Sequence, residues 1–119
     1  MFSVAFYEDK SGAEPVKDLL ITLQEKAKTS KEHRIRSEKI LTYIRILQEY
    51  GTRAGMPYMK HIDGDVWELR PTSDRIFFFY FRDNTFILLH HFLKKTNKTP
   101  KKEIDQAIRN MADHLERNR

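Results

Sequence analysis

The sequence predicts an α+β fold, in which a small, twisted, mainly antiparallel sheet carries two helices from the N-terminal part and one from the C-terminus. Apolar residues recur at helical spacing between Pro15 and Gly51. From Gly55 the pattern changes to the short alternating or aromatic runs of strands, and it returns to helical spacing after Thr99. We expect residues 1–119 to form a single domain, because this length supports one hydrophobic core and not two.

The first half of the chain predicts a strand followed by two helices. Ser3 to Tyr7 is short, apolar and aromatic, as in a strand. The first helix starts at Pro15, and its apolar positions recur at helical spacing: Val16, Leu19, Leu20, Leu23 and Ala27. Thr29 is the predicted N-cap of the second helix, since Glu32 lies at capping-box spacing, and Gly51 ends that helix. Its basic residues are expected to face outward: Arg34, Arg36, Lys39 and Arg45.

Three or four antiparallel strands are predicted next. Val66 to Arg70 alternates, with Trp67 and Leu69 on one face. Arg75 to Arg82 is apolar on both faces, which fits a central strand with helices over one face and a second face that needs cover. A tight turn at 83–84 joins it to a partner strand at 85–93. Residues 58–62 are the candidate for one more strand.

The segment before the last helix is rich in lysine. Thr99 fits the N-cap and Pro100 the first helical position, so this helix is predicted to begin at Thr99. Lysines in the first turn oppose the helix dipole unless an anion binds there. Free N–H groups and five lysines therefore predict a phosphate site, the lysines being Lys94, Lys95, Lys98, Lys101 and Lys102. The alternative is a solvated basic turn.

Composition narrows the classes of function. Twenty-two Lys and Arg against seventeen Asp and Glu give a formal charge of +5, which suits a nucleic acid, a ribosome or an acidic protein as partner. The absence of cysteine excludes disulfides, thiolate zinc sites and cysteine nucleophiles. No apolar run is long enough for a membrane span and no signal-peptide pattern is present, so we expect a cytoplasmic protein without a membrane partner. We also expect no metal and no cofactor.

Two arginines are candidates for binding a phosphate. Arg70 and Arg75 flank a short connection, PTSD, so a hairpin places both guanidinium groups on neighbouring strands, where Lys60 and Lys94 or Lys95 can join them. The alternative is that the two arginines form ordinary surface salt bridges with Glu68 and Asp74.

Other candidates are histidines and aromatic residues. His61 is an acid-base candidate, although a lone histidine is more often structural. His90 and His91 are neighbours on a strand and point to opposite faces, so they do not form a ligand pair. Four aromatic residues either stack on bases or belong to the core, namely Trp67, Phe77, Phe79 and Tyr80.

Linked motifs from Val66 to the last helix resemble a known toxin family. These motifs are VWELRP, RIFFFYF and ILLHHFLKKTNKTPKKEIDQA, of which the lysine-rich tail is the most specific. They resemble the RelE/ParE toxin superfamily and its phage-derived Gp49-like branch, called HigB. The resemblance implies a RelE-like fold and a toxin of a type II toxin-antitoxin system, acting as a ribosome-dependent mRNA endoribonuclease. It also implies a helix-turn-helix, HigA-like antitoxin, and binding of operator DNA through the toxin-antitoxin complex.

The resemblance also suggests roles for individual residues. By position, Arg70 is similar to the family's arginine near the scissile phosphate, and the rest of the suggested catalytic set is Lys60, Arg75, Lys94 and Lys95. We expect Lys98, Lys101 and Lys102 to bind RNA. The better-studied RelE proteins have a C-terminal tyrosine, but no tyrosine follows Tyr80 here, so the proton-transfer group remains open between a lysine, His61 and Tyr58. Two other functions stay open: a ParE-like toxin of DNA gyrase and a non-enzymatic co-repressor.

Overall fold

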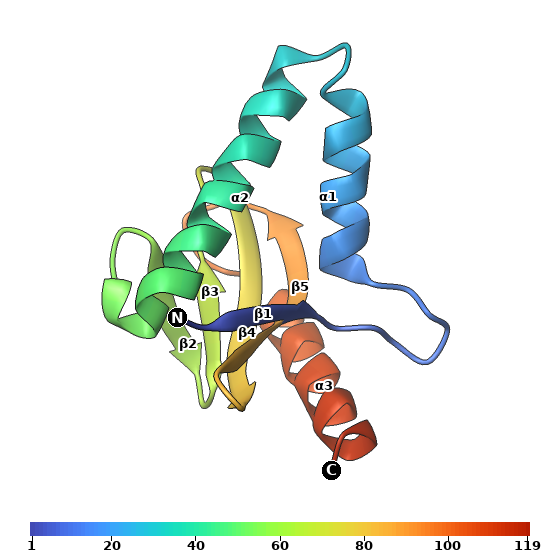
Figure 1. The fold of residues 1–119 in the computed structure, drawn as a ribbon, viewed down its shortest axis with the longest axis vertical. Coiled ribbons are helices and arrows are strands. Elements are labelled where there is room, and N and C mark those ends of the chain that lie inside the picture. Colours follow the sequence, from blue (N-terminus) through green and yellow to red (C-terminus); the bar gives the residue numbers. More distant parts are fainter.

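The computed structural model describes residues 1–119 as one five-stranded sheet with helices on both faces (Figure 1). In chain order the elements are β1 (Ser3–Phe6), α1 (Pro15–Lys26), α2 (Lys31–Tyr50), the 3-10 helix η1 (Gly51–Ala54), β2 (Met59–Asp63), β3 (Val66–Leu69), β4 (Asp74–Arg82), β5 (Thr85–Leu93) and α3 (Lys101–Arg117). The predicted α+β class is confirmed, with all four strands of the second half present and each strand end within one residue of its predicted position.

The sheet has the strand order β1-β5-β4-β3-β2. All neighbouring strands are antiparallel except β1, which pairs in parallel with β5. The predicted tight hairpin joins β4 to β5, and Asp83 and Asn84 have φ angles of 53° and 57°. Two successive positive φ angles are typical of a type I′ turn, whose twist matches that of the strands it connects.

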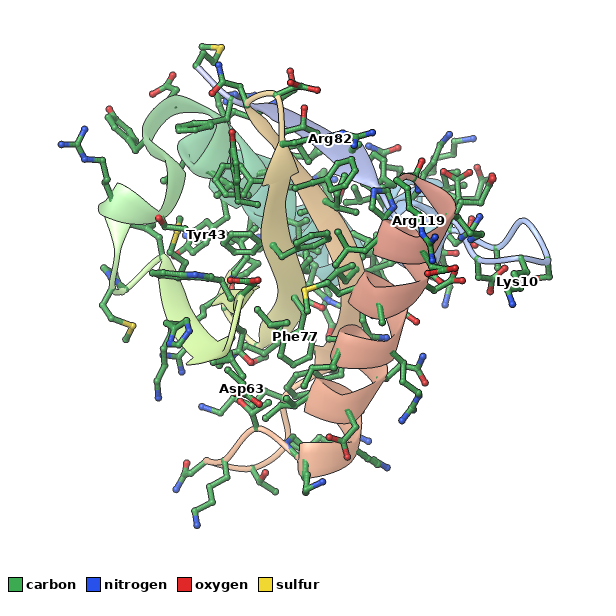
Figure 2. The ribbon with its side chains drawn as sticks, turned by 90° about the horizontal axis from the view of Figure 1, so that it is seen from below. Lys10, Tyr43, Asp63, Phe77, Arg82 and Arg119 are labelled. Carbon is green, nitrogen blue, oxygen red and sulfur yellow. The ribbon has the colours of Figure 1, made fainter.

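Helices cover both faces of the central strands, which explains why β4 is apolar throughout. On one face, α1 and α2 pack against side chains such as Ile76 and Leu88. On the opposite face, α3 inserts Ala107 among Phe77 and Leu89 (Figure 2). Full burial of one leucine, isoleucine or phenylalanine side chain stabilises a fold by about 1.5–3 kcal/mol. The two cores therefore hold α3 and the α1–α2 pair on the sheet.

The start of α2 differs from the prediction by one residue. Thr29 is not the N-cap, because its N–H donates to the Lys26 carbonyl and the residue belongs to the turn that follows α1. The cap is Ser30, whose hydroxyl oxygen accepts the backbone N–H of His33 at 3.4 Å.

The start of α3 also differs from the prediction. The helix begins at Lys101 with Pro100 as N-cap, and no side chain caps it. Thr99 does not cap the helix, because its hydroxyl donates instead to the carboxylate of Glu68 on β3, at 3.1 Å. A buried carboxylate is a stronger acceptor than water, so this tertiary contact replaces the local cap.

Candidate functional site

One buried carboxylate gathers the residues of the candidate site. Glu68 is 1% exposed, and its Oε1 lies 3.5 Å from Nε of Arg70 and 3.8 Å from Nε of Arg75. Its other oxygen accepts the hydroxyl of Thr99. We call these four residues, together with Lys60, the Glu68 cluster. The cluster therefore joins the end of β3, the start of β4 and the lysine-rich segment before α3.

The two arginines have different environments. Arg75 is 6% exposed, and its Nη1 donates to the carbonyls of Thr72 and Asp74 at 2.8 and 3.0 Å. Burial, and then the charge of Arg70, lower the pKa of Arg75. The Arg70 side chain keeps 20% of its surface exposed, and its Nη1 contacts Sδ of Met56 at 3.4 Å. Arg75 is thus anchored inside the protein, while Arg70 is the guanidinium open to solvent.

The alternative of surface salt bridges expected Asp74 to pair with one of the two arginines. Asp74 pairs instead with Arg36 of α2. Nη2 of Arg36 lies 2.7 Å from Oδ1 of Asp74, and its Nε lies 3.1 Å from Oδ2, which is a bidentate pair. These hydrogen bonds raise the pKa of Arg36. The prediction that Arg36 faces outward is therefore wrong, because its long side chain reaches from α2 to the buried carboxylate of Asp74.

Lys60 joins the cluster through the strand register. It lies opposite Glu68 in the antiparallel pair of β2 and β3, so both side chains are on the same face of the sheet. Lys60 is exposed and forms no ion pair. Its ammonium group is available to a ligand beside Arg70.

The lysines after β5 do not form one group. Lys94 lines a cavity of about 600 Å³ between α2 and the β3–β4 turn, and its backbone N–H donates to Ser73. Lys95 and Lys102 line a separate hollow of about 360 Å³ at the start of α3. Lys98 is exposed in the segment between them, and Lys101 forms an ion pair with Asp105 at 2.9 Å. Of the suggested catalytic residues, only Lys60, Arg70 and Arg75 converge.

Two tyrosines lie next to the cluster, one of them missed by sequence reasoning. The rings of Tyr43, which Figure 2 labels, and Tyr58 meet edge to face with centroids 5.4 Å apart. Tyr43 is close enough to Arg75 for its ionised form to oppose the lowering of the Arg75 pKa. Neither tyrosine hydroxyl has a hydrogen-bond partner within the protein. Tyr43 belongs to α2 and follows Lys39 by one helical turn, which is the only feature of the sequence that relates it to a basic residue. Nζ of Lys39 lies 5.9 Å from the centroid of its ring.

The histidines lie away from Arg70. Nε2 of His61 donates to the Gly64 carbonyl at 2.7 Å, and its ring contacts Trp67, so the side chain of His61 on β2 is tied to the β2–β3 turn. His90 contacts Glu103 on the α3 side, with Nε2 and Oε1 2.8 Å apart. His91 lies opposite Ile76 in the pairing of β4 with β5. Burial, and then the charge of His90, lower the pKa of His91. No group of three or more His, Asp or Glu side chains is close enough to bind a metal ion.

A comparison with protein families assigns the chain. The family described as phage derived protein Gp49-like matches residues 25–112, which is more than half of the chain. The chain belongs to the Gp49-like family. This is a family of RelE/HigB-like toxins, so the suggested resemblance is confirmed. A search of curated proteins finds no match.

The matched range of this Gp49-like protein includes the whole Glu68 cluster and both tyrosines beside it. It also includes every lysine of the segment before α3. A toxin of this family implies an antitoxin partner. None of the helices of this toxin is both long enough and apolar enough to cross a membrane.

Proposed function

We propose that this Gp49-like toxin is a ribosome-dependent endoribonuclease that cleaves translated mRNA. The observation that carries the proposal is the Glu68 cluster, in which a solvent-facing Arg70 is held beside a buried Arg75 and an unpaired Lys60. Arginine offers two parallel N–H groups to phosphate oxygens, and a second cation beside it favours the dianionic transition state of phosphate transfer.

The reaction has three chemical requirements. The RNA 2′-hydroxyl must lose its proton and align with phosphorus, the extra negative charge on phosphorus must be stabilised, and the departing 5′-oxygen must gain a proton. Arg70 and Lys60 serve the second requirement. Arg75 acts as a positioning residue, because its guanidinium is committed to carbonyl oxygens and orients Glu68, which in turn holds Arg70.

Proton transfer falls to Tyr58 or Lys60 in this proposal. The backbone N–H of Arg70 donates to the carbonyl of Tyr58 at 2.9 Å, so this tyrosine lies next to the proposed phosphate site. His61 is the weaker candidate, since its Nε2 is occupied by Gly64. Because no hydrogen bond within the protein positions the side chain of Tyr58 or of Lys60, we propose that the ribosome aligns the mRNA with them.

The basic segment before α3 extends the proposed RNA site. Lys95 and Lys102 share one hollow at the uncapped start of α3, and Lys98 is exposed nearby. Exposed ammonium groups bind the RNA backbone irrespective of sequence. Lys94 and Lys101 are weaker members of this set, because Lys94 faces the cavity beside α2 and Lys101 is paired with Asp105.

The proposed partners follow from the same charges. A helix-turn-helix, HigA-like antitoxin with an acidic segment is expected to cover the basic surface, and the complex to bind operator DNA. A ParE-like gyrase toxin is the second candidate, because such toxins belong to the same superfamily as the RelE-like endoribonucleases. Gyrase is a protein target, however, and its inhibition gives no role to the partly exposed guanidinium of Arg70 beside Lys60.

The test is a cell-free translation reaction with mapping of mRNA 5′ ends. We expect cuts with the toxin and ribosomes, no cuts in ribosome-free RNA, and a loss of about 100-fold or more with Arg70→Ala. Arg45→Ala is the matched control, because Arg45 is exposed on α2 and forms no ion pair. Intact mRNA from folded toxin would contradict the proposal and direct the next assay to gyrase and to operator binding.

A further inference from the structure

An aromatic groove lies at the end of β3 opposite to Arg70. It has a volume of about 460 Å³, within the range of small-ligand sites. Five aromatic rings line it: Phe2, Tyr50, Trp67, Tyr80 and Phe86. Of the four aromatic residues considered for base stacking from the sequence, Phe77 and Phe79 are buried beside α3, whereas Trp67 and Tyr80 belong to this groove.

The rings of the groove hold one another in place. Phe2 contacts Phe86 and Tyr80 with centroids 5.1 and 6.5 Å apart, and Tyr80 lies 5.4 Å from Phe86. Phe2 is seated against Gly51, where an added Cβ would lie 2.7 Å from its Cε2. Tyr80 nevertheless remains 47% exposed. The groove is therefore preformed, and a planar ligand gains stacking contacts without rearranging it.

Polar groups at the groove fit a nucleotide. Arg53 and Asp65 line it, both are exposed, and neither forms an ion pair with another side chain. A free guanidinium binds a phosphate oxygen, and an ionised carboxylate accepts N–H groups from the edge of a base. The chain as a whole carries a formal charge of +5, which favours an anionic ligand over a cationic one.

We propose that the aromatic groove binds one unpaired nucleobase of single-stranded RNA. β3 is four residues long, so the groove lies about 13 Å along the strand from Arg70. Trp67 packs on the α1–α2 face of the sheet and the Glu68 cluster lies on the α3 face, so an RNA strand that reaches both sites passes around the edge strand β2. The base stacks against Tyr80 and Trp67, and Arg53 holds its phosphate. The inference rests on the proposed function only in taking RNA as the ligand, and it assigns the groove a role in selecting the mRNA sequence near the cut.

Trp67 makes the test direct, because it is the only tryptophan in the chain. The probe is a 2′-O-methyl RNA hexamer, which lacks the nucleophilic hydroxyl and stays intact. We expect a saturable change in tryptophan fluorescence with the hexamer, and none with an abasic hexamer that carries the same phosphates. An equal response to both oligonucleotides would show phosphate binding alone and overturn the proposal.

Variants locate the binding. Tyr80→Leu keeps an apolar side chain without the ring, and Tyr50→Ala removes a residue that is 57% exposed at the end of α2. Each is expected to raise the hexamer Kd at least about fivefold. Ile21→Ala is the control, since Ile21 is an exposed apolar residue on α1 outside the groove. Circular dichroism checks that each variant is folded.

Two further outcomes separate this inference from the nuclease proposal. Hexamer binding that both tyrosine variants weaken, in a protein that cuts no mRNA, would keep the groove as an RNA site and remove the nuclease. Ribosome-dependent cutting by a protein whose fluorescence does not respond to the hexamer, or whose Kd both tyrosine variants leave unchanged, would keep the nuclease and overturn the groove.

Discussion

The hydroxyl of Thr99 donates a hydrogen bond of 3.1 Å to Oε2 of Glu68 on β3. The two residues are 31 positions apart, and the bond ties the basic segment before α3 to the carboxylate that lies beside Arg70 and Arg75. This contact makes the position of the lysines depend on the same buried acid as the proposed phosphate site.

Thr99→Val tests that connection. Valine keeps the shape of the side chain and leaves Glu68 with one donor fewer, so we expect a loss of about 1 kcal/mol in the free energy of unfolding. We also expect several-fold weaker cleavage of translated mRNA, because the basic segment moves relative to Arg70. Urea titration and 5′-end mapping provide the two measurements. Thr22→Val, at an exposed position on α1, is the control, and equal urea midpoints for the Thr99 variant and the parent would exclude the contact.

Glu68→Gln tests the buried charge. Glutamine has nearly the same shape but removes the ion-pair partner of the buried Arg75, so we expect a loss of about 3 kcal/mol in the free energy of unfolding. Urea titration measures it, and the exposed Glu116→Gln serves as control. A Glu68 variant as stable as the Glu116 variant would show that Arg75 is held by the carbonyls of Thr72 and Asp74 alone.

Tyr58→Phe tests the proton-transfer step. The hydroxyl of Tyr58 forms no hydrogen bond within the protein, so its removal is expected to leave stability unchanged. If Tyr58 transfers a proton, cleavage in the translation reaction falls by about 100-fold or more. Tyr43→Phe, which removes the neighbouring hydroxyl, is the matched comparison. Full cleavage by both variants would assign the proton transfer to Lys60 or to the ribosome.

His114→Phe tests the source of acid sensitivity. Burial, followed by the charges of Arg117 and Arg82, lowers the pKa of His114 below its usual 6.5, against a smaller opposing effect of Asp113. The unfolded chain therefore protonates His114 more readily than the folded protein does. The contribution of neutral His114 to the free energy of unfolding is fully present above about pH 6.5 and is lost as the pH falls below that value. His91 has the same sign, since its pKa is also lowered.

The replacement has two expected results. Nε2 of His114 is buried without a partner and the ring meets Phe79 and Phe81 edge to face, so phenylalanine should raise the free energy of unfolding by about 1 kcal/mol at pH 7. It should also reduce the fall in melting temperature between pH 7 and pH 5. An unchanged pH dependence would place the acid sensitivity at His91. His61→Gln is the control, because His61 is exposed.

The sequence by itself determined the elements and the family of this protein. Helical spacing, alternation and turn residues are local properties, and they were enough to predict each α-helix and strand, the tight turn at Asp83 and Asn84, and the opposite faces of His90 and His91, although not the 3-10 helix η1. The motifs from Val66 onward indicated the toxin family, which the match to residues 25–112 confirms.

The tertiary structure decided which side chains meet. Arg36 looked like a solvent-facing residue of α2, yet it pairs with Asp74, 38 positions away. Thr99 had the local features of a helix cap, yet it bonds to Glu68. Lys94 and Lys95 looked like one basic pair, yet they line different hollows, because successive residues of an extended chain point to opposite sides. Local propensity fixes the backbone of an element, but a buried charge takes whichever partner the packing of distant elements brings within reach, and no local pattern records that partner.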